Sequence, residues 1–336
     1  MEALTLEGDS AARHARSGCE RLVARPLVVD LFAGMGGLSL GFRQVGFEVH
    51  GYDAERHAVA SYAANVGPAR LMNLRDELPD EVPAILVGGP PCRPWSPINL
   101  QRRRTSHSDY DLVDRFRQSV IAMHPCAFVL ENVPFLKNDA QYRALIESLA
   151  VQYVLTEDIY SYAEWGAATR RRRLFAIGIE KGHTDGTSSV VDGISRRRRN
   201  PQSVAEAIRG LSLDRADPHF DHDWPQFRTI EKYAHKYATG KYGWYRLDEG
   251  VPAPSFGNVM KTYTLRRGSG GIPDRAVSPR EAIAILGFPS SYRFPAAVPR
   301  TAKYRMAADA VSPVFGEVVA EVLAEELGWS RGGPHA

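Results

Sequence analysis

The feature that most constrains the fold is an apolar run that ends in glycines near residue 33. The run LVVDLFA at 27–33 has the length of a strand, and LSLGFRQVG at 38–46 is typical of a helix. A second strand candidate, FEVHGYD at 47–53, follows directly. A strand, a glycine turn, a helix and another strand in this order predict a βαβ unit.

Further apolar runs continue this alternation, with stretches between them that are long enough for crossover helices. They are AILVGG at 84–89, AFVLENV at 127–133 and RLFAIGIE at 173–180. The spacing predicts an α/β fold with a doubly wound, mostly parallel sheet. Near the carboxyl end, SPREAIAILGFP at 278–289 predicts a helix with a serine cap and a Gly-Phe-Pro stop. PVFGEVVAEVLAEEL at 313–327 predicts a last helix that packs back on the sheet.

The βα pattern stops near residue 181, where an exposed loop rich in polar residues begins. Residues 200–270 carry aromatics, prolines and charges without alternation, which indicates a second, smaller and irregular domain. We expect a division into a mobile tail at 1–26, a main domain at 27–180, an irregular region at 181–262, a connecting segment at 263–299 and a carboxyl-terminal helical segment at 300–330 that returns to the main domain.

Composition excludes several classes of protein. The chain has 336 residues, of which 44% are hydrophobic, so it can bury a large core. Its three cysteines form no CxxC pair, which argues against a disulfide framework and against a zinc site, and indicates a reducing compartment. Of these, Cys126 is assigned to packing and Cys19 to the tail. No run approaches the ~20 apolar residues of a membrane span, and no signal peptide is apparent, so we expect a cytoplasmic protein.

The arginines are clustered, although the net charge is only +3. Runs of arginine occur at 102–104, 170–173 and 196–199. Such clusters are typical of a solvated face or of contact with a polyanion. Because acids elsewhere balance them, the pattern favours contact with nucleic acid along one surface.

The glycine turn predicts a nucleotide-like ligand. Gly34, Gly36 and Gly37 fall where the strand turns into the helix, so that backbone amides can approach a ligand closely. Asp53 stands at the end of the next strand, in the place where an acid accepts hydrogen bonds from ribose hydroxyls. The spacing GxGG, in place of GxGxxG, favours an adenosine ligand without a pyrophosphate, and a dinucleotide remains the alternative.

Cys92 and Glu131 each follow an apolar strand, and therefore lie at the edge of the sheet where α/β folds bind ligands. Two prolines stiffen the approach to Cys92, which suits a nucleophile, although a buried structural thiol is the alternative. In a desolvated cleft, a carboxyl beside this thiol has a raised pKa and can donate a proton.

Six blocks in order resemble the cytosine carbon-5 DNA methyltransferases, over most of 27–327. The blocks are DLFAGMGG, GGPPCRPWS, ENV, RRRR before a strand, RAVSPREAIAILGFP and ADAVSP. The resemblance implies a Rossmann-like fold that binds S-adenosylmethionine, and it makes 181–262 the target-recognition region. The residues it assigns to the cofactor are Phe32, Gly34, Gly36, Gly37, Leu38, Asp53, Asn73, Pro90, Asp309 and Val311.

The resemblance also implies catalytic roles. Cys92 would be the nucleophile, Glu131 would contact the base at N3, and Asn132 would shape the loop. Arg171 and Arg173 would orient the base and the catalytic pair. No metal is implied.

Four positions depart from the pattern of this family. Thr169 stands where glutamine is usual before the arginines, and Asn73 stands where an acid often meets the adenine. Asp309 and Ala308 replace the asparagine and the glycine of the usual GNAV block. The departures concern the cofactor site and leave the class of reaction unchanged.

The implied substrate is double-stranded DNA, with the target cytosine turned out of the helix. The residues expected to contact it are Ser96, Arg102, Arg103, Arg104, Lys232, Lys236 and Lys241. The lysines belong to a stretch at 228–246 in which basic and aromatic side chains alternate, and for which a tyrosine-rich core helix is the alternative. A monomer and a partner restriction endonuclease are expected. The alternatives are the same chemistry on transfer RNA or on a free pyrimidine nucleotide, or a DNA-binding subunit without catalysis.

Overall fold

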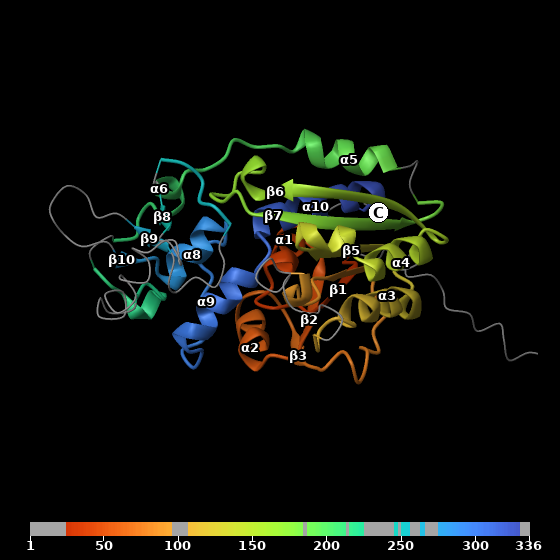
Figure 1. Cartoon of the computed structure of the whole chain (residues 1–336), viewed down its shortest axis with the longest axis horizontal. Helices are drawn as coiled ribbons and strands as arrows, with labels where there is room; N and C mark the ends of the chain where they lie inside the picture. The colour runs from red at the N-terminus through yellow and green to blue at the C-terminus, as the bar shows by residue number, and fades with distance from the viewer. Residues whose placement is uncertain are drawn as a thin grey trace, which may run out of the picture.

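The structure is a computed structural model, and it describes residues 25–95, 107–183, 187–212, 215–224, 245–247, 250–255, 263–265 and 275–329. Figure 1 shows a sheet flanked by helices and a smaller group of elements beside it. Within the described residues, no helix is long and apolar enough to cross a membrane.

A seven-stranded sheet in the order β3-β2-β1-β4-β5-β7-β6 forms the centre of the larger part. Its first five strands in this order pair in parallel, and β7 runs antiparallel to both of its neighbours. The predicted α/β fold with a mostly parallel sheet is therefore confirmed. The strands are β1 (Leu27–Leu31), β2 (Glu48–Asp53), β3 (Ala69–Leu71), β4 (Ile85–Gly88), β5 (Ala127–Asn132), β6 (Tyr153–Ser161) and β7 (Arg172–Glu180).

Helices cover both faces of the sheet because successive strand residues point to opposite sides. On β5, Ala127 and Val129 pack in the core cluster that contains α1 and α10, whereas Phe128 and Leu130 pack in the cluster that contains α3 and α4. The helices of the larger part are α1 (Gly37–Val45), α2 (Arg56–Asn65), α3 (Leu112–Met123), α4 (Ala140–Leu149), α5 (Thr187–Arg196) and α10 (Pro313–Glu326), with short turns η2 (Arg93–Trp95), η4 (Pro134–Asn138) and η5 (Tyr162–Glu164).

The smaller part contains a three-stranded sheet in the order β10-β9-β8 (Figure 1). Its elements are α6 (Val204–Ala207), η6 (Pro218–Phe220), β8 (Tyr245–Leu247), β9 (Tyr263–Leu265), β10 (Arg275–Ala276), α8 (Pro279–Ile285) and α9 (Arg300–Asp309). The helix predicted at 278–289 is confirmed as α8, because Ser278 and Glu281 form the reciprocal hydrogen bonds of a capping box. The last helix is confirmed as α10.

The sequence argued against a disulfide framework and assigned Cys126 to packing. This residue is fully buried in the core, and it is disulfide-bonded. Cys92 is a free thiol. The absence of a CxxC pair excludes only bonds between neighbouring cysteines, so it carried no information about a bond between distant ones.

Helices α1 and α10 cross at backbone contact distance, because glycines face each other at the crossing. A Cβ atom added to Gly41 would lie 2.2 Å from the backbone nitrogen of Glu317 and 2.3 Å from the carbonyl carbon of Gly316. Backbone atoms cannot move aside as a side chain can. The crossing fixes the start of α1, and hence the glycine turn, against the chain that enters α10.

We expect Gly41→Ala to lower the free energy of unfolding by about 3 kcal/mol, since the added methyl group must push two helices apart. Urea unfolding measures this loss. Gly193→Ala on α5 is the matched control, because the added Cβ would meet only methyl groups of Val322, at 3.1 Å. Equal losses in the two variants would contradict the tight crossing.

Candidate functional site

The glycine turn after β1 opens onto a cavity. Gly34 and Gly36 have φ values of +56° and +81°, in the left-handed region that favours glycine. A Cβ atom on Gly34 would meet nothing within 4 Å, whereas one on Gly36 would lie 2.7 Å from the ring of Tyr62. Gly34 therefore faces open space, and Gly36 serves the turn and its packing.

Asp53 fixes this turn to the end of β2. Its two carboxylate oxygens accept hydrogen bonds from the backbone N–H groups of Gly34 and Glu55, both at 2.8 Å. Burial raises the pKa of Asp53, and the two N–H groups act against that shift. Each carboxylate oxygen has a second lone pair. Asp53 can therefore hold the turn and still accept a hydrogen bond from a ligand in the cavity.

We expect Asp53→Ala to weaken binding of S-adenosylmethionine roughly 10- to 100-fold, because a charged acceptor and the anchor of the turn are both lost. The effect on turnover should be smaller, since the predicted ribose contact would be made in the ground and transition states alike. Calorimetry without DNA measures the affinity. Unchanged affinity would contradict the assignment.

Cys92 lies just after β4, at the start of η2. Its backbone carbonyl accepts a hydrogen bond from Trp95 at 3.0 Å, which closes the turn after the two prolines. Burial in the cleft raises the pKa of the Cys92 thiol, and the positive charge of Arg173 acts most strongly in the opposite direction. The negative charges of Asp309 and Glu131 add to the rise.

Glu131 ends β5 and is 6% exposed. Its Oε1 pairs with Nε of Arg173 at 3.0 Å. A Cβ atom on Gly89 would lie 2.9 Å from Oε2 of Glu131, so a glycine at this position leaves room for the carboxylate. Burial raises the pKa of Glu131 although Arg173 and Arg171 oppose the rise. A larger fraction of this carboxyl is therefore protonated near neutral pH than in an ordinary glutamate.

Asn132 ties the end of β5 to the turn that carries Cys92. Its Nδ2 donates a hydrogen bond to the carbonyl of Pro90 at 2.9 Å, and its Oδ1 accepts one from the N–H of Val133 at 2.9 Å. Both functional atoms of the amide are thus used in holding the two loops together. The arrangement agrees with a residue that shapes the loop.

The two predicted arginines occupy different environments. Arg173 lies on β7 beside Glu131, with its side chain 11% exposed. Arg171 is 1% exposed and donates from Nη1 to the carbonyl of Ala308, at the end of α9. Burial lowers the pKa of Arg171 to about 10, so the guanidinium stays charged at neutral pH.

These side chains surround one cavity of about 420 Å³, a volume in the range of small-molecule sites. The predicted residues that line it are Phe32, Gly34, Gly37, Leu38, Asp53, Asn73, Pro90, Cys92, Glu131, Asn132, Arg173, Asp309 and Val311. Gly36 and Arg171 are not part of the lining. The carbonyl of Val311 would lie 2.1 Å from a Cβ atom on Gly37, so the chain entering α10 closes directly onto the glycine turn.

Asn73 is at the rim of the cavity and its amide is engaged locally. Nδ2 donates to Asp76 at 2.7 Å, and Oδ1 accepts from the N–H of Arg75 at 3.3 Å. These bonds form a turn that presents Arg75 to Asp109 and Asp111, at 3.3 and 3.1 Å. A contact between Asn73 and an adenine remains a prediction.

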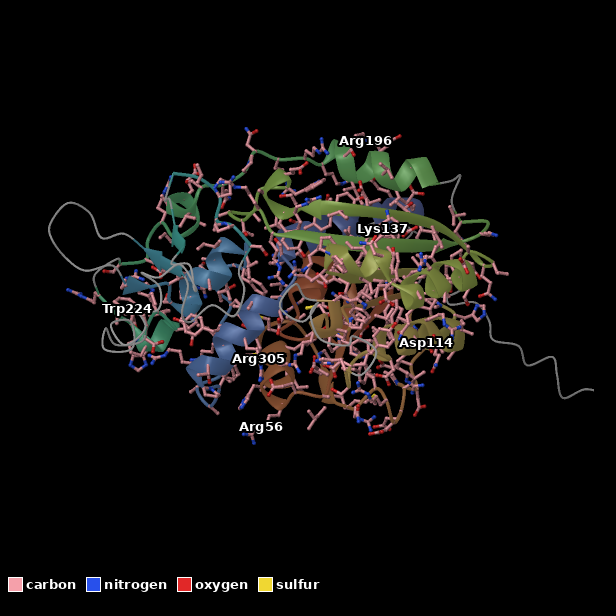
Figure 2. The ribbon with its side chains drawn as sticks, in the orientation of Figure 1. Arg56, Asp114, Lys137, Arg196, Trp224 and Arg305 are labelled. Carbon is pink, nitrogen blue, oxygen red and sulfur yellow. The ribbon has the colours of Figure 1, made fainter. Side chains whose placement is uncertain are left out.

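Sequence reasoning missed six charged residues of the lining, among them Asp30, Glu55 and Arg305. Asp30 accepts a hydrogen bond from Oγ of Ser39 at 2.5 Å, and burial raises its pKa to about 8. Arg305, which Figure 2 labels on α9, pairs with Glu55 at 3.4 Å. The signal for Asp30 was present in the sequence, because an acid inside an apolar strand needs a partner. No local pattern marks Arg305 and Glu55, which meet only through the fold.

The arginine run at 196–199 pairs mainly with acids of the protein itself. Arg197 forms ion pairs with Glu321, at 2.8 Å, and with Glu325, both on α10. Arg199 lies 3.8 Å from Glu317, also on α10. Figure 2 shows Arg196 at the end of α5, over the main sheet. This run therefore fastens α5 and the chain after it to α10.

The residues expected to contact nucleic acid, namely Ser96, Arg102, Arg103, Arg104, Lys232, Lys236 and Lys241, all lie outside the described residues. Across the part of the chain that the structure describes, no group of three histidine, cysteine, aspartate or glutamate side chains could hold a metal ion.

Comparison with known proteins gives consistent matches. The model of the family described as C-5 cytosine-specific DNA methylase matches residues 27–325. The Type II methyltransferase M.NlaX of Neisseria lactamica is 26% identical over 328 residues, which cover 89% of this chain and 96% of that protein. The Type II methyltransferase M.AplI of Arthrospira platensis is 29% identical over 160 residues, and the match spans 46% of each protein, about half the length of that relative.

A solved structure supports the fold. The crystal structure of a DNA modification methyltransferase encoded within a prophage of E. coli superimposes with a TM-score of 0.67 and 22% identity. The superposition covers 90% of this chain and 99% of that one.

Proposed function

Because the chain belongs to the C-5 cytosine-specific DNA methylase family, we propose that it transfers a methyl group from S-adenosylmethionine to carbon 5 of a cytosine in DNA. The observation that carries the proposal is the single cavity described above. Its lining brings together the glycine turn and Asp53 with Cys92, Glu131 and Arg173.

The residues of the cavity suit S-adenosylmethionine. The left-handed glycine turn offers backbone next to open space at Gly34, and Asp53 offers acceptors for ribose hydroxyls. The carboxyl of Glu55 also lines the cavity and offers a further hydrogen-bond acceptor. Phe32, Leu38, Pro90 and Val311 would supply apolar contacts. When bound there, S-adenosylmethionine supplies an electrophilic methyl group for carbon 5.

The chemistry requires activation of the base, because carbon 5 of an aromatic cytosine is a weak nucleophile. The Cys92 thiolate forms a bond to carbon 6, and Glu131 delivers a proton to N3 as the ring loses its aromaticity. Electron density then lies at carbon 5, the position that is methylated. Loss of the proton from carbon 5 to solvent, elimination of the Cys92 thiolate and return of the N3 proton to Glu131 restore the ring, so the products are 5-methylcytosine, S-adenosylhomocysteine and one proton. Arg173 acts on both catalytic side chains, because its positive charge favours the Cys92 thiolate and its ion pair orients Glu131.

The cavity can receive a cytosine only when the base leaves the helical stack, which costs a few kcal/mol. We propose that the region at 181–262 recognises the target sequence. Arg102, Arg103 and Arg104 would meet phosphates, and Ser96, Lys232, Lys236 and Lys241 would add contacts to DNA. A monomer in the cytoplasm, acting on the same site as a cognate endonuclease, fits this function.

The experiment compares transfer of radiolabelled methyl groups from S-adenosylmethionine to unmethylated duplex DNA, transfer RNA and free pyrimidine nucleotides. We expect labelling of duplex DNA alone, recovered as 5-methylcytosine. Labelling of transfer RNA or of nucleotides in preference to DNA would replace the proposed substrate. Tight binding of DNA without labelling of any substrate would indicate a subunit without catalysis.

A further inference from the structure

The turn that precedes Arg171 and Arg173 is held by a segment that is distant in sequence. The backbone N–H of Ala253 donates to the carbonyl of Ala168 at 2.8 Å, and the N–H of Arg170 donates to the carbonyl of Ala253 at 2.7 Å. These bonds form a parallel bridge between Thr169 and Ala253. Residues 250–255 thus run beside the turn, and they belong to the region that we propose recognises the target.

The side chain of Thr169 adds a second connection. Its Oγ1 donates a hydrogen bond to the carbonyl of Pro254 at 3.2 Å and accepts one from the N–H of Arg171 at 3.3 Å. A hydroxyl has one proton and two lone pairs, so it can make both bonds at once. Thr169 is fully buried, and water cannot replace the hydroxyl if it is removed.

Arg171 connects this hydroxyl to the rest of the site. Its carbonyl accepts a hydrogen bond from the N–H of Tyr162 at 3.0 Å, and its guanidinium donates to the carbonyl of Ala308. Two residues further along β7, Arg173 pairs with Glu131. A shift of the Arg171 backbone would therefore be felt both at the end of α9 and at the catalytic carboxyl.

We propose that the Thr169 hydroxyl is a positioning group that couples the placement of residues 250–255 to methyl transfer through Arg171. The inference rests on the proposed function, since it needs Arg171 and Arg173 to act in that reaction. Glutamine is usual at this position in the family, so this chain makes the connection with a shorter side chain. When binding of the target fixes the position of residues 250–255, these hydrogen bonds also fix the turn at residues 168–171.

The test compares Thr169→Val, which keeps the branched shape and removes the hydroxyl, with Thr169→Ser, which keeps the hydroxyl. The substrate is unmethylated plasmid DNA that the native enzyme methylates. We expect Thr169→Val to lower the single-turnover rate of methyl transfer about tenfold, because two buried polar groups lose their partner. The affinity for S-adenosylmethionine without DNA should stay within twofold, and Thr169→Ser should restore the rate to within threefold.

A double-mutant cycle with Arg171→Lys separates positioning from general loosening. If Thr169 acts through Arg171, adding Thr169→Val to Arg171→Lys should lower the remaining rate by less than threefold. A full tenfold loss in both backgrounds would overturn the proposal. A native rate in Thr169→Val would also overturn it, as would a fall in thermal stability together with lost cofactor affinity. If the native enzyme methylates no DNA, the proposed function itself fails, and the two failures are thus distinguishable.

Discussion

Cys92→Ser is expected to abolish methyl transfer, with a loss of at least about 10⁴-fold, as is found when a covalent nucleophile is removed. A hydroxyl is far less acidic than a thiol, so it offers no anion to attack carbon 6. The pKa of the Cys92 thiol is itself raised by burial. In the native enzyme the rate should therefore rise with pH as the thiolate forms. Methylation of duplex DNA across a range of pH values measures both effects.

DNA that carries 5-fluorocytosine at target positions provides a separate readout for Cys92. Fluorine cannot leave carbon 5 as a cation, so once the methyl group has been transferred the thiolate cannot be eliminated, and the bond between the sulfur and carbon 6 persists. We expect the native enzyme to remain attached to this DNA on a denaturing gel and Cys92→Ser to be released. Thermal melting and affinity for S-adenosylmethionine should match the native values. Attachment of the serine variant would remove Cys92 as the nucleophile.

The sequence predicted the strands that carry the site but not those at the edges of the sheet. The central strands β1, β4 and β5 are buried on both faces, so they read as continuous apolar runs. β3 has three residues, and β6 has the sequence YVLTEDIYS, in which apolar and polar residues mix because one side is partly exposed. Such patterns resemble loops when each is read alone.

The sequence likewise predicted the main residues of the site but not the partners that they meet in the fold. Cys92, Glu131 and Asp53 were found because each follows an apolar strand, and the carboxyl ends of parallel strands meet at one edge. The partners that decide their chemistry are distant in sequence. The ion pair of Glu131 with Arg173 depends on β7 running antiparallel to β5, and the burial of Arg171 depends on α9. Local patterns contain no information on such distances.

Charge runs were the least informative signal. Arginines at 170–173 and at 196–199 look alike in sequence, but the first run contributes Arg173 to the cavity and the second pairs with acids of α10. Glu317, Glu321 and Glu325 recur every four residues, so they form one face of α10. That spacing could have indicated an internal partner for the second run.

Glu131→Gln should lower the rate of methyl transfer about 10³-fold, in the range that a general acid contributes. The amide keeps the size of the side chain and can donate a hydrogen bond, but it cannot deliver a proton to N3. Burial raises the pKa of Glu131, so the protonated form persists closer to neutral pH than usual and is lost as the pH rises through that pKa. In the native enzyme this loss opposes the gain of thiolate at Cys92, and the rate should pass through a maximum.

The variant should lose the decline on the alkaline side of that maximum, because glutamine does not titrate, and should keep the rise on the acid side that reports Cys92. Glu147→Gln is the matched control, since it makes the same change on an exposed position of α4 and should leave the profile unaltered. Affinity for S-adenosylmethionine should be unchanged, because Glu131 is assigned to the base and not to the cofactor. A decline that persists in Glu131→Gln would assign the alkaline limb to another group, and a rate within tenfold of the native value would exclude Glu131 as the proton donor.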